Sequence, residues 1–261
     1  ELNVDALRKI GYDILRMKVR SALTQGTNEI SAAEGIRTSL RLGDSALIVG
    51  EVRSEEAKAL YEAMRIGALA NVVAGTIHGD SPYGVFDRVV NDLKVPPTSF
   101  KATDIIVVTN PIKTPDGLRS AKRVVQITEV RKHWENDPLR EKGFVDLMRY
   151  NVETDVLEPT PELINGDSEI IKSIASNVKG WAGNWDAVFD NIILRGKIKE
   201  EIVNASIKLN KPKIMEAEFN ALTNNAFHKI SEDVRSEHGL PSSDKVLPIF
   251  IDWLNKEAEM F

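Results

Sequence analysis

Residues 45–52, Ser45-Ala-Leu-Ile-Val-Gly-Glu-Val52, form a continuous apolar run that ends in glycine and glutamate. A run of this kind is typical of a strand that is buried on both faces. A second such run, residues 71–77, follows a segment that has helical periodicity between Ser54 and Gly67. Strand, helix and strand in this order predict an α/β unit with a largely parallel sheet.

The same alternation extends outward from this unit. Ser31, with Glu34 three residues later, is a good start for a helix. Residues 1–150 are assigned to one α/β domain. Its further expected elements are helices at residues 31–41 and 83–93 and strands at residues 104–109 and 123–130, the two strands being joined by a turn.

The pattern changes after about residue 150, where strand signals fade and helical periodicity dominates. Residues 151–261 are therefore expected to form a second, all-helical and acidic domain. Its expected helices are residues 167–178, 184–195, 197–208, 214–236 and 243–259, separated by short breaks rich in Gly, Asn and Pro.

Composition narrows the function classes. The chain has 261 residues, a net charge of -5 and no cysteine, which excludes disulfides and thiolate metal sites. Neither domain has the basic excess that a nucleic-acid face usually needs, so no nucleic-acid partner is expected. No apolar run approaches the roughly 20 residues of a membrane helix. These features are typical of a cytoplasmic protein.

Two side chains follow the predicted parallel strands. Glu51 ends the first strand and His78 follows the second, so both are expected at the carboxyl edge of the sheet, where ligands of open α/β sheets bind. A carboxylate and an imidazole in one crevice are suited to proton transfer or polarisation of water. The alternative is structural: Glu51 caps the next helix, and His78 simply ends a strand.

Gly79 and Gly84 have the G-x-x-x-x-G spacing of a phosphate-binding loop. However, Asp80 would repel phosphate, Pro82 lacks an N–H donor, and no lysine follows the second glycine. Asp80 and Ser81 instead suit a turn that caps a helix starting near Pro82. The loop is therefore expected to be a helix start and not a phosphate cradle.

Four arginines lie close in sequence to the Glu51 strand: Arg20, Arg37, Arg41 and Arg53. Arginine can neutralise phosphate charge from within a subunit or from a neighbouring one. For any single one of them, a solvated surface position is the ordinary alternative.

Several segments resemble one family, the type II/type IV secretion ATPases, and most closely its archaeal branch that assembles pili and archaella. Residues 35–68, GIRTSLRLGDSALIVGEVRSEEAKALYEAMRIGA, are similar to the family's Walker B region. GTIHGD (residues 75–80) resembles its histidine box. Similar segments also occur at ELNVDALRKIGY (residues 1–12), KRVVQITEV (residues 122–130) and the helical stretch of residues 168–197.

The resemblance implies a RecA-like P-loop ATPase core, followed by a helical domain, in a hexameric motor that drives protein export or filament assembly. It implies that Glu51 is the Walker B glutamate, which polarises the attacking water and supports Mg²⁺ through a water molecule. His78 would report the γ-phosphate. The nucleotide-contacting residues implied with them are Gly50, Thr76, Arg37, Arg41, Arg53 and, more weakly, Arg20.

The family's Walker A loop, G-x-x-x-x-G-K-[ST], does not occur in this sequence. We therefore expect the chain to be the C-terminal portion of a longer ATPase that binds Mg²⁺ and ATP only weakly by itself. Its expected partners are further copies of itself, the segment that carries Walker A, and a membrane platform protein. The alternative is a non-catalytic oligomerisation or docking module of a secretion or pilus complex.

Overall fold

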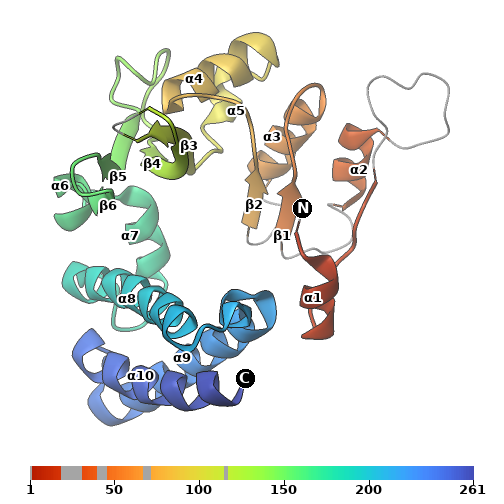
Figure 1. Cartoon of the computed structure of the whole chain (residues 1–261). Helices are drawn as coiled ribbons and strands as arrows, with labels where there is room; N and C mark the ends of the chain where they lie inside the picture. The colour runs from red at the N-terminus through yellow and green to blue at the C-terminus, as the bar shows by residue number, and fades with distance from the viewer. Residues whose placement is uncertain (1, 19–30, 40–45, 67–71, 115–116) are drawn as a thin grey trace. The chain divides into compact units, whose positions relative to one another are not determined.

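The computed structural model of the chain describes residues 2–18, 31–39, 46–66, 72–114 and 117–261. These residues form two compact units: residues 17–170 make one, and residues 1–16 with residues 171–261 make the other. The fold is mixed α/β with a helical C-terminal region, as the sequence predicts (Figure 1).

A two-stranded parallel sheet contains the first predicted strands. β1 (Ala46–Val49) pairs with β2 (Val72–Gly75), with Val49 opposite Gly75, and α3 (Glu56–Ile66) lies between them in sequence. Strand, helix and strand are thus confirmed in the predicted order. The predicted helix before them is α2 (Ala32–Ser39), which packs against α3.

The loop that resembles a phosphate cradle leads into a helix, as predicted. α4 (Pro82–Asp87) begins with proline in its first turn and continues as a π-helix, η1 (Arg88–Asp92). The backbone N–H of Gly84 donates to the Ser81 hydroxyl at 3.0 Å, so Ser81 is the N-cap. A short helix, α5 (Pro97–Phe100), follows.

The second sheet corrects the expectation of a largely parallel sheet. Its four strands are antiparallel in the order β3-β4-β5-β6: β3 (Ile105–Lys113), β4 (Ser120–Val130), β5 (Phe144–Asn151) and β6 (Val156–Pro159). The short turn after β3 decides this, because parallel neighbours need a crossover of about a dozen residues or more. The strand pair β5–β6 was not predicted, and the expected domain boundary after residue 150 falls inside β5.

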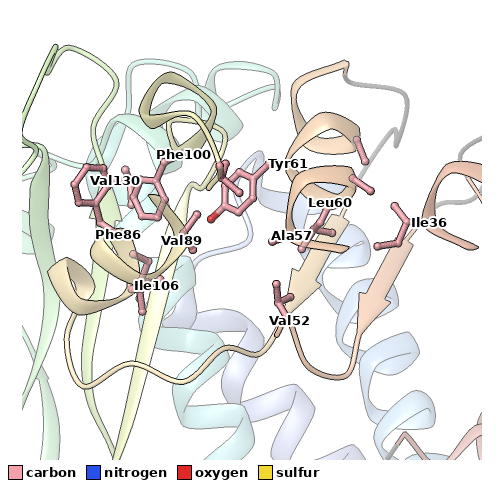
Figure 2. Close-up of a cluster of buried hydrophobic side chains, with 14 of the residues drawn as sticks. Ile36, Val52, Ala57, Leu60, Tyr61, Phe86, Val89, Phe100, Ile106 and Val130 are labelled. Atoms are coloured by element: carbon pink, nitrogen blue, oxygen red, sulfur yellow. The ribbon is translucent and has the colours of Figure 1, made fainter. Parts of the chain in front are cut away.

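A single apolar core joins both sheets of the unit of residues 17–170 (Figure 2). Phe86 packs edge-on against Phe100, with ring centroids 5.1 Å apart, and against Trp134, at 5.6 Å. From α3, Leu60 and Tyr61 add to the same core, and both side chains are buried. Burial of these large apolar side chains is the main contribution that fixes the position of α3. It thereby also fixes the segment between β1 and α3.

Three long helices form most of the other unit: α8 (Trp185–Leu209), α9 (Ala217–His238) and α10 (Ser243–Met260). A 3-10 turn, η2 (Pro212–Met215), joins the first two, and α1 (Val4–Lys9) packs against α9. The short helix α7 (Glu169–Ser176) precedes them along the chain, whereas α6 (Pro161–Ile164) contacts β5 and belongs to the unit of residues 17–170.

The break predicted between residues 195 and 197 is wrong, because α8 is continuous through Gly196. A mid-helix glycine costs only about 1 kcal/mol. Leu194 and Ile198 on either side of it are buried in the helical core, which offsets this cost. Within the described ranges, no helix is long and apolar enough to cross a membrane.

Candidate functional site

The parallel pairing of β1 and β2 continues past the ends of both strands. The backbone N–H of Thr76 donates to the carbonyl of Val49 at 3.4 Å, and the N–H of Val52 donates to the carbonyl of Thr76 at 2.8 Å. The Thr76 hydroxyl also donates to the Gly50 carbonyl. The segment of Glu51 is therefore held beside the segment that leads to His78.

Glu51, Arg53 and His78 meet at this edge of the sheet. Nε2 of His78 lies 3.1 Å from Oε1 of Glu51, and the Arg53 guanidinium forms an ion pair with Oε2 of the same carboxylate. The Glu51 side chain is 26% exposed, against 70% for Arg53 and 80% for His78. The predicted proximity of Glu51 and His78 is thus confirmed. The partly buried Glu51 carboxylate lies between two exposed side chains, the Arg53 guanidinium and the His78 imidazole.

The two neighbours act on the carboxylate electrostatically. The hydrogen bond from Arg53 is the largest influence and, with smaller contributions from the charges of Arg53 and His78, it holds the pKa of Glu51 below its ordinary value. Glu51 in turn raises the pKa of Arg53. Glu51 is therefore ionised at neutral pH and can accept a hydrogen bond from water or from another donor.

Glu56 is a part of this site that sequence reasoning did not single out. Its carboxylate accepts the backbone N–H of Arg53, the N–H of Ser54 at 2.9 Å and the Ser54 hydroxyl at 2.6 Å, and Glu56 is only 8% exposed. Burial is the largest single influence and would raise the pKa of Glu56, but these hydrogen bonds together outweigh it and lower the pKa below its ordinary value. Glu56, and not Glu51, thus fixes the start of α3. In the sequence, the helix-capping residue type of Ser54, two residues before Glu56, indicates that a helix starts here.

The other predicted site residues are distributed differently. Arg37, on α2, pairs with Glu62 of α3 at 3.5 Å, so its partner is not Glu51. Gly50 has open space where a Cβ would stand, so packing does not demand glycine there. The predicted positions Arg20 and Arg41 lie outside the described residues.

The Gly79–Gly84 loop owes its glycines to packing. A Cβ on Gly79 would lie 2.7 Å from a methyl group of Val85, and one on Gly84 would lie 2.5 Å from Oδ1 of Asp80. The Asp80 carboxylate also accepts the Ser81 hydroxyl at 2.9 Å. The loop is a close-packed helix start that carries the Asp80 carboxylate. A carboxylate there would repel phosphate, which agrees with the prediction that the loop is not a phosphate-binding loop.

Mg²⁺ fits this edge only through water. Both oxygens of Glu51 already contact Arg53 or His78, and Mg²⁺ commonly keeps several waters between itself and a protein carboxylate. In the part of the chain that the structure describes, no group of three or more His, Asp or Glu side chains is arranged to hold a metal ion.

Comparison with known proteins adds one relative. The chain is 31% identical over 149 residues to the uncharacterized protein MJ1287 of Methanocaldococcus jannaschii. The matched segment is 56% of this chain and 50% of that protein, so the chain spans about half the length of this relative. No family model matches the chain.

Proposed function

We propose that this chain is the Walker B and histidine-box portion of a RecA-like secretion ATPase that couples ATP hydrolysis to protein export or filament assembly. The observation that carries this proposal is the contact of Glu51 with both Arg53 and His78, at the carboxyl ends of two parallel strands. In open α/β sheets this edge is the usual ligand site.

Each residue then has a role that its environment suits. Glu51 is ionised, so its carboxylate can orient the water that attacks the γ-phosphate. Arg53 and His78 have largely exposed side chains, so either can turn from Glu51 to a phosphate group. Bound Mg²⁺ would neutralise phosphate charge, and Glu51 would support it through water.

One face of the β1–β2 sheet supports the idea of a larger core. Ile48 and Val72 are 50% and 52% exposed, and Ala46 and Ala74 beside them are exposed as well. Parallel sheets are ordinarily covered on both faces. We infer that a segment carrying the Walker A loop covers this face, that the assembled motor is a hexamer, and that it works at the cytoplasmic face of a membrane on a platform protein.

The second candidate is a non-catalytic oligomerisation or docking module of the same kind of complex. The observation that favours it is the engagement of both Glu51 oxygens by Arg53 and His78. A carboxylate used only as the centre of a structural ion-pair cluster would show the same geometry. The two candidates differ in whether Glu51 acts on a nucleotide.

The deciding experiment uses the longer protein that includes the sequence encoded upstream of this chain. Glu51→Gln should nearly abolish ATP turnover and leave binding of a fluorescent ATP analogue intact, because it removes the carboxylate that orients water. Glu55→Gln, at an exposed neighbouring glutamate, is the matched control and should hydrolyse ATP normally. Normal turnover in Glu51→Gln would show that Glu51 is not the catalytic carboxylate, and absence of ATP turnover in the unmodified protein would favour the docking module.

A further inference from the structure

A cavity of about 610 Å³ opens between α3 and residues 94–99. It lies in the unit of residues 17–170, and neither Glu51 nor His78 lines it. Small-molecule sites commonly have volumes of roughly 300–1,000 Å³. The cavity is thus large enough for a ligand of its own, separate from the site at the strand ends.

Positive charge dominates its walls. Lys58 and Arg65 come from α3, and Lys94 comes from the opposite side. The one carboxylate among the lining residues is Glu62, which is already paired with Arg37. Among the described residues, neither lysine has a carboxylate within ion-pair distance.

The deeper wall is apolar, with one free donor. Tyr61 and Val95 are buried there, and the Tyr61 hydroxyl is engaged with Thr103 at 2.9 Å. Nη1 of Arg65 donates to the Ser99 hydroxyl at 3.1 Å, and Ser99 is only 4% exposed. Because Ser99 accepts in that bond, its own hydrogen remains available to donate into the cavity.

Lys94 stands at an unusual backbone position. Its φ is +56°, two residues after the end of η1, where the N–H of Val95 donates to the carbonyl of Val89 at 3.1 Å. Glycine is the residue that ordinarily fills such a left-handed helix end, so a lysine here is strained. The Lys94 side chain is exposed, so no packing contact offsets this strain. The lysine does, however, add a third cation to the cavity.

We propose that this cavity binds a small, multiply charged oxyanion of the phosphate type, either free polyphosphate or the phosphate of a small metabolite. Three cations and a buried hydroxyl offer hydrogen-bond donors, and the one carboxylate, Glu62, is paired with Arg37, so the cavity matches a ligand whose oxygens accept. The proposal is independent of the ATPase proposal, because it shares no residue with the Glu51 cluster.

A simpler role must be separated from this one. Arg65 lies in the last turn of α3 and Lys94 follows the end of η1, and cations stabilise the C-terminal ends of helices. If that were their whole role, replacing them would lower stability and would not change binding of an anion.

Calorimetric titration of the chain at low ionic strength tests the proposal, with inorganic pyrophosphate and glycerol 3-phosphate as separate probes. The tighter probe identifies the ligand class. Saturable binding of one equivalent is expected, weakened about fivefold or more by Lys58→Gln and by Lys94→Gln, since each removes a charge-assisted contact. Lys94→Gly should raise the melting temperature yet weaken binding, which separates a ligand role from a structural one.

Two control variants locate the site. Lys172→Gln and Lys122→Gln, at exposed lysines outside the cavity, should bind the probe as the unmodified chain does. Absence of saturable binding would overturn the proposal. So would full binding in Lys94→Gly, or a loss in the control variants as large as in Lys94→Gly.

Discussion

Nε2 of His78 lies 3.1 Å from Oε1 of Glu51, although the two residues follow different strands. The parallel register that sets Val49 opposite Gly75 brings them together. Arg53 reaches the other oxygen from the same segment as Glu51. The Glu51 carboxylate therefore takes part in a local contact, with Arg53, and in a long-range contact, with His78. Its pKa can be measured to test both.

Arg53→Gln should raise the pKa of Glu51 toward the ordinary value of about 4.3, because Arg53 is the largest influence that lowers it. His78→Gln should raise it by less. Carbon-detected NMR titration of the carboxyl group measures both. Arg37→Gln, whose arginine pairs with Glu62, is the control and should leave the Glu51 pKa unchanged.

The same contact has a defined pH window. Since the folded pKa of Glu51 is lowered, its contribution to stability is present above the ordinary carboxyl pKa and is lost as pH falls through the lowered value. Melting temperatures of the chain and of Glu51→Gln should therefore converge below about pH 4. A difference that stayed constant down to pH 2 would contradict the ion pairing.

Tyr61→Phe should destabilise the unit of residues 17–170 by about 1–3 kcal/mol, because it leaves the buried hydroxyl of Thr103 without its partner. Urea unfolding measures this. Tyr12→Phe, at an exposed tyrosine, should have no effect. Adding Thr103→Val to Tyr61→Phe should recover part of the loss; full additivity would show that the two hydroxyls do not interact.

Burial raises the pKa of Tyr61 to about 12. A raised folded pKa stabilises the fold below the unfolded value of about 10, and this contribution is lost as pH rises through the folded value. The free energy of unfolding should therefore fall between about pH 10 and 12, and it should fall less steeply in Tyr61→Phe. Parallel pH profiles for the two proteins would argue against burial of this phenol.

Glu129→Ala should cost about 3–5 kcal/mol, the usual loss when one partner of a buried ion pair is removed. Glu129 is fully buried, contacts Nε of Arg131 at 3.0 Å and accepts the backbone N–H of Glu169 at 3.0 Å. The Ser168 hydroxyl donates to it as well. Urea unfolding measures the stability of Glu129→Ala and of a control, Glu153→Ala. Glu153 is exposed, so its replacement should change the free energy of unfolding by less than about 0.5 kcal/mol.

Two glycine-to-alanine changes should differ sharply. A Cβ at Gly143 would lie 2.5 Å from Trp134 and 2.8 Å from the backbone of Pro138, so Gly143→Ala should destabilise by about 1–3 kcal/mol. Gly50→Ala meets open space and should leave the melting temperature nearly unchanged. Equal effects of the two changes would show that the packing around Trp134 is looser than described.

Local patterns predicted the elements that local chemistry controls. The apolar runs of β1 and β2, the helical face of α3 and the Ser81–Pro82 helix start are all readable because each depends on neighbours within a few residues. The Glu51–Arg53 contact was not predicted, although the two residues are only two apart in the chain.

The antiparallel sheet, the buried Glu129 and the continuity of α8 were not predicted. A strand run does not state its direction, and only the short turn between β3 and β4 decides it. From the sequence alone, Glu129 is expected to be a surface residue. In the fold, Arg131, Ser168 and the backbone of Glu169 contact its carboxylate. The burial of Glu129 and the continuity of α8 depend on partners that are distant in sequence, which periodicity does not report. The antiparallel pairing of β3 and β4, in contrast, follows from a short turn that the sequence does show.

By itself, the sequence determined that an α/β segment precedes a helical region and that Glu51 and His78 follow two adjacent parallel strands. Only the tertiary structure decided that the Glu51 carboxylate touches both Arg53 and His78, that Glu56 holds the start of α3, and that three cations line one cavity. The physical reason is that side-chain contacts are set by packing and register across elements, whereas periodicity reports only which residues of one element share a face.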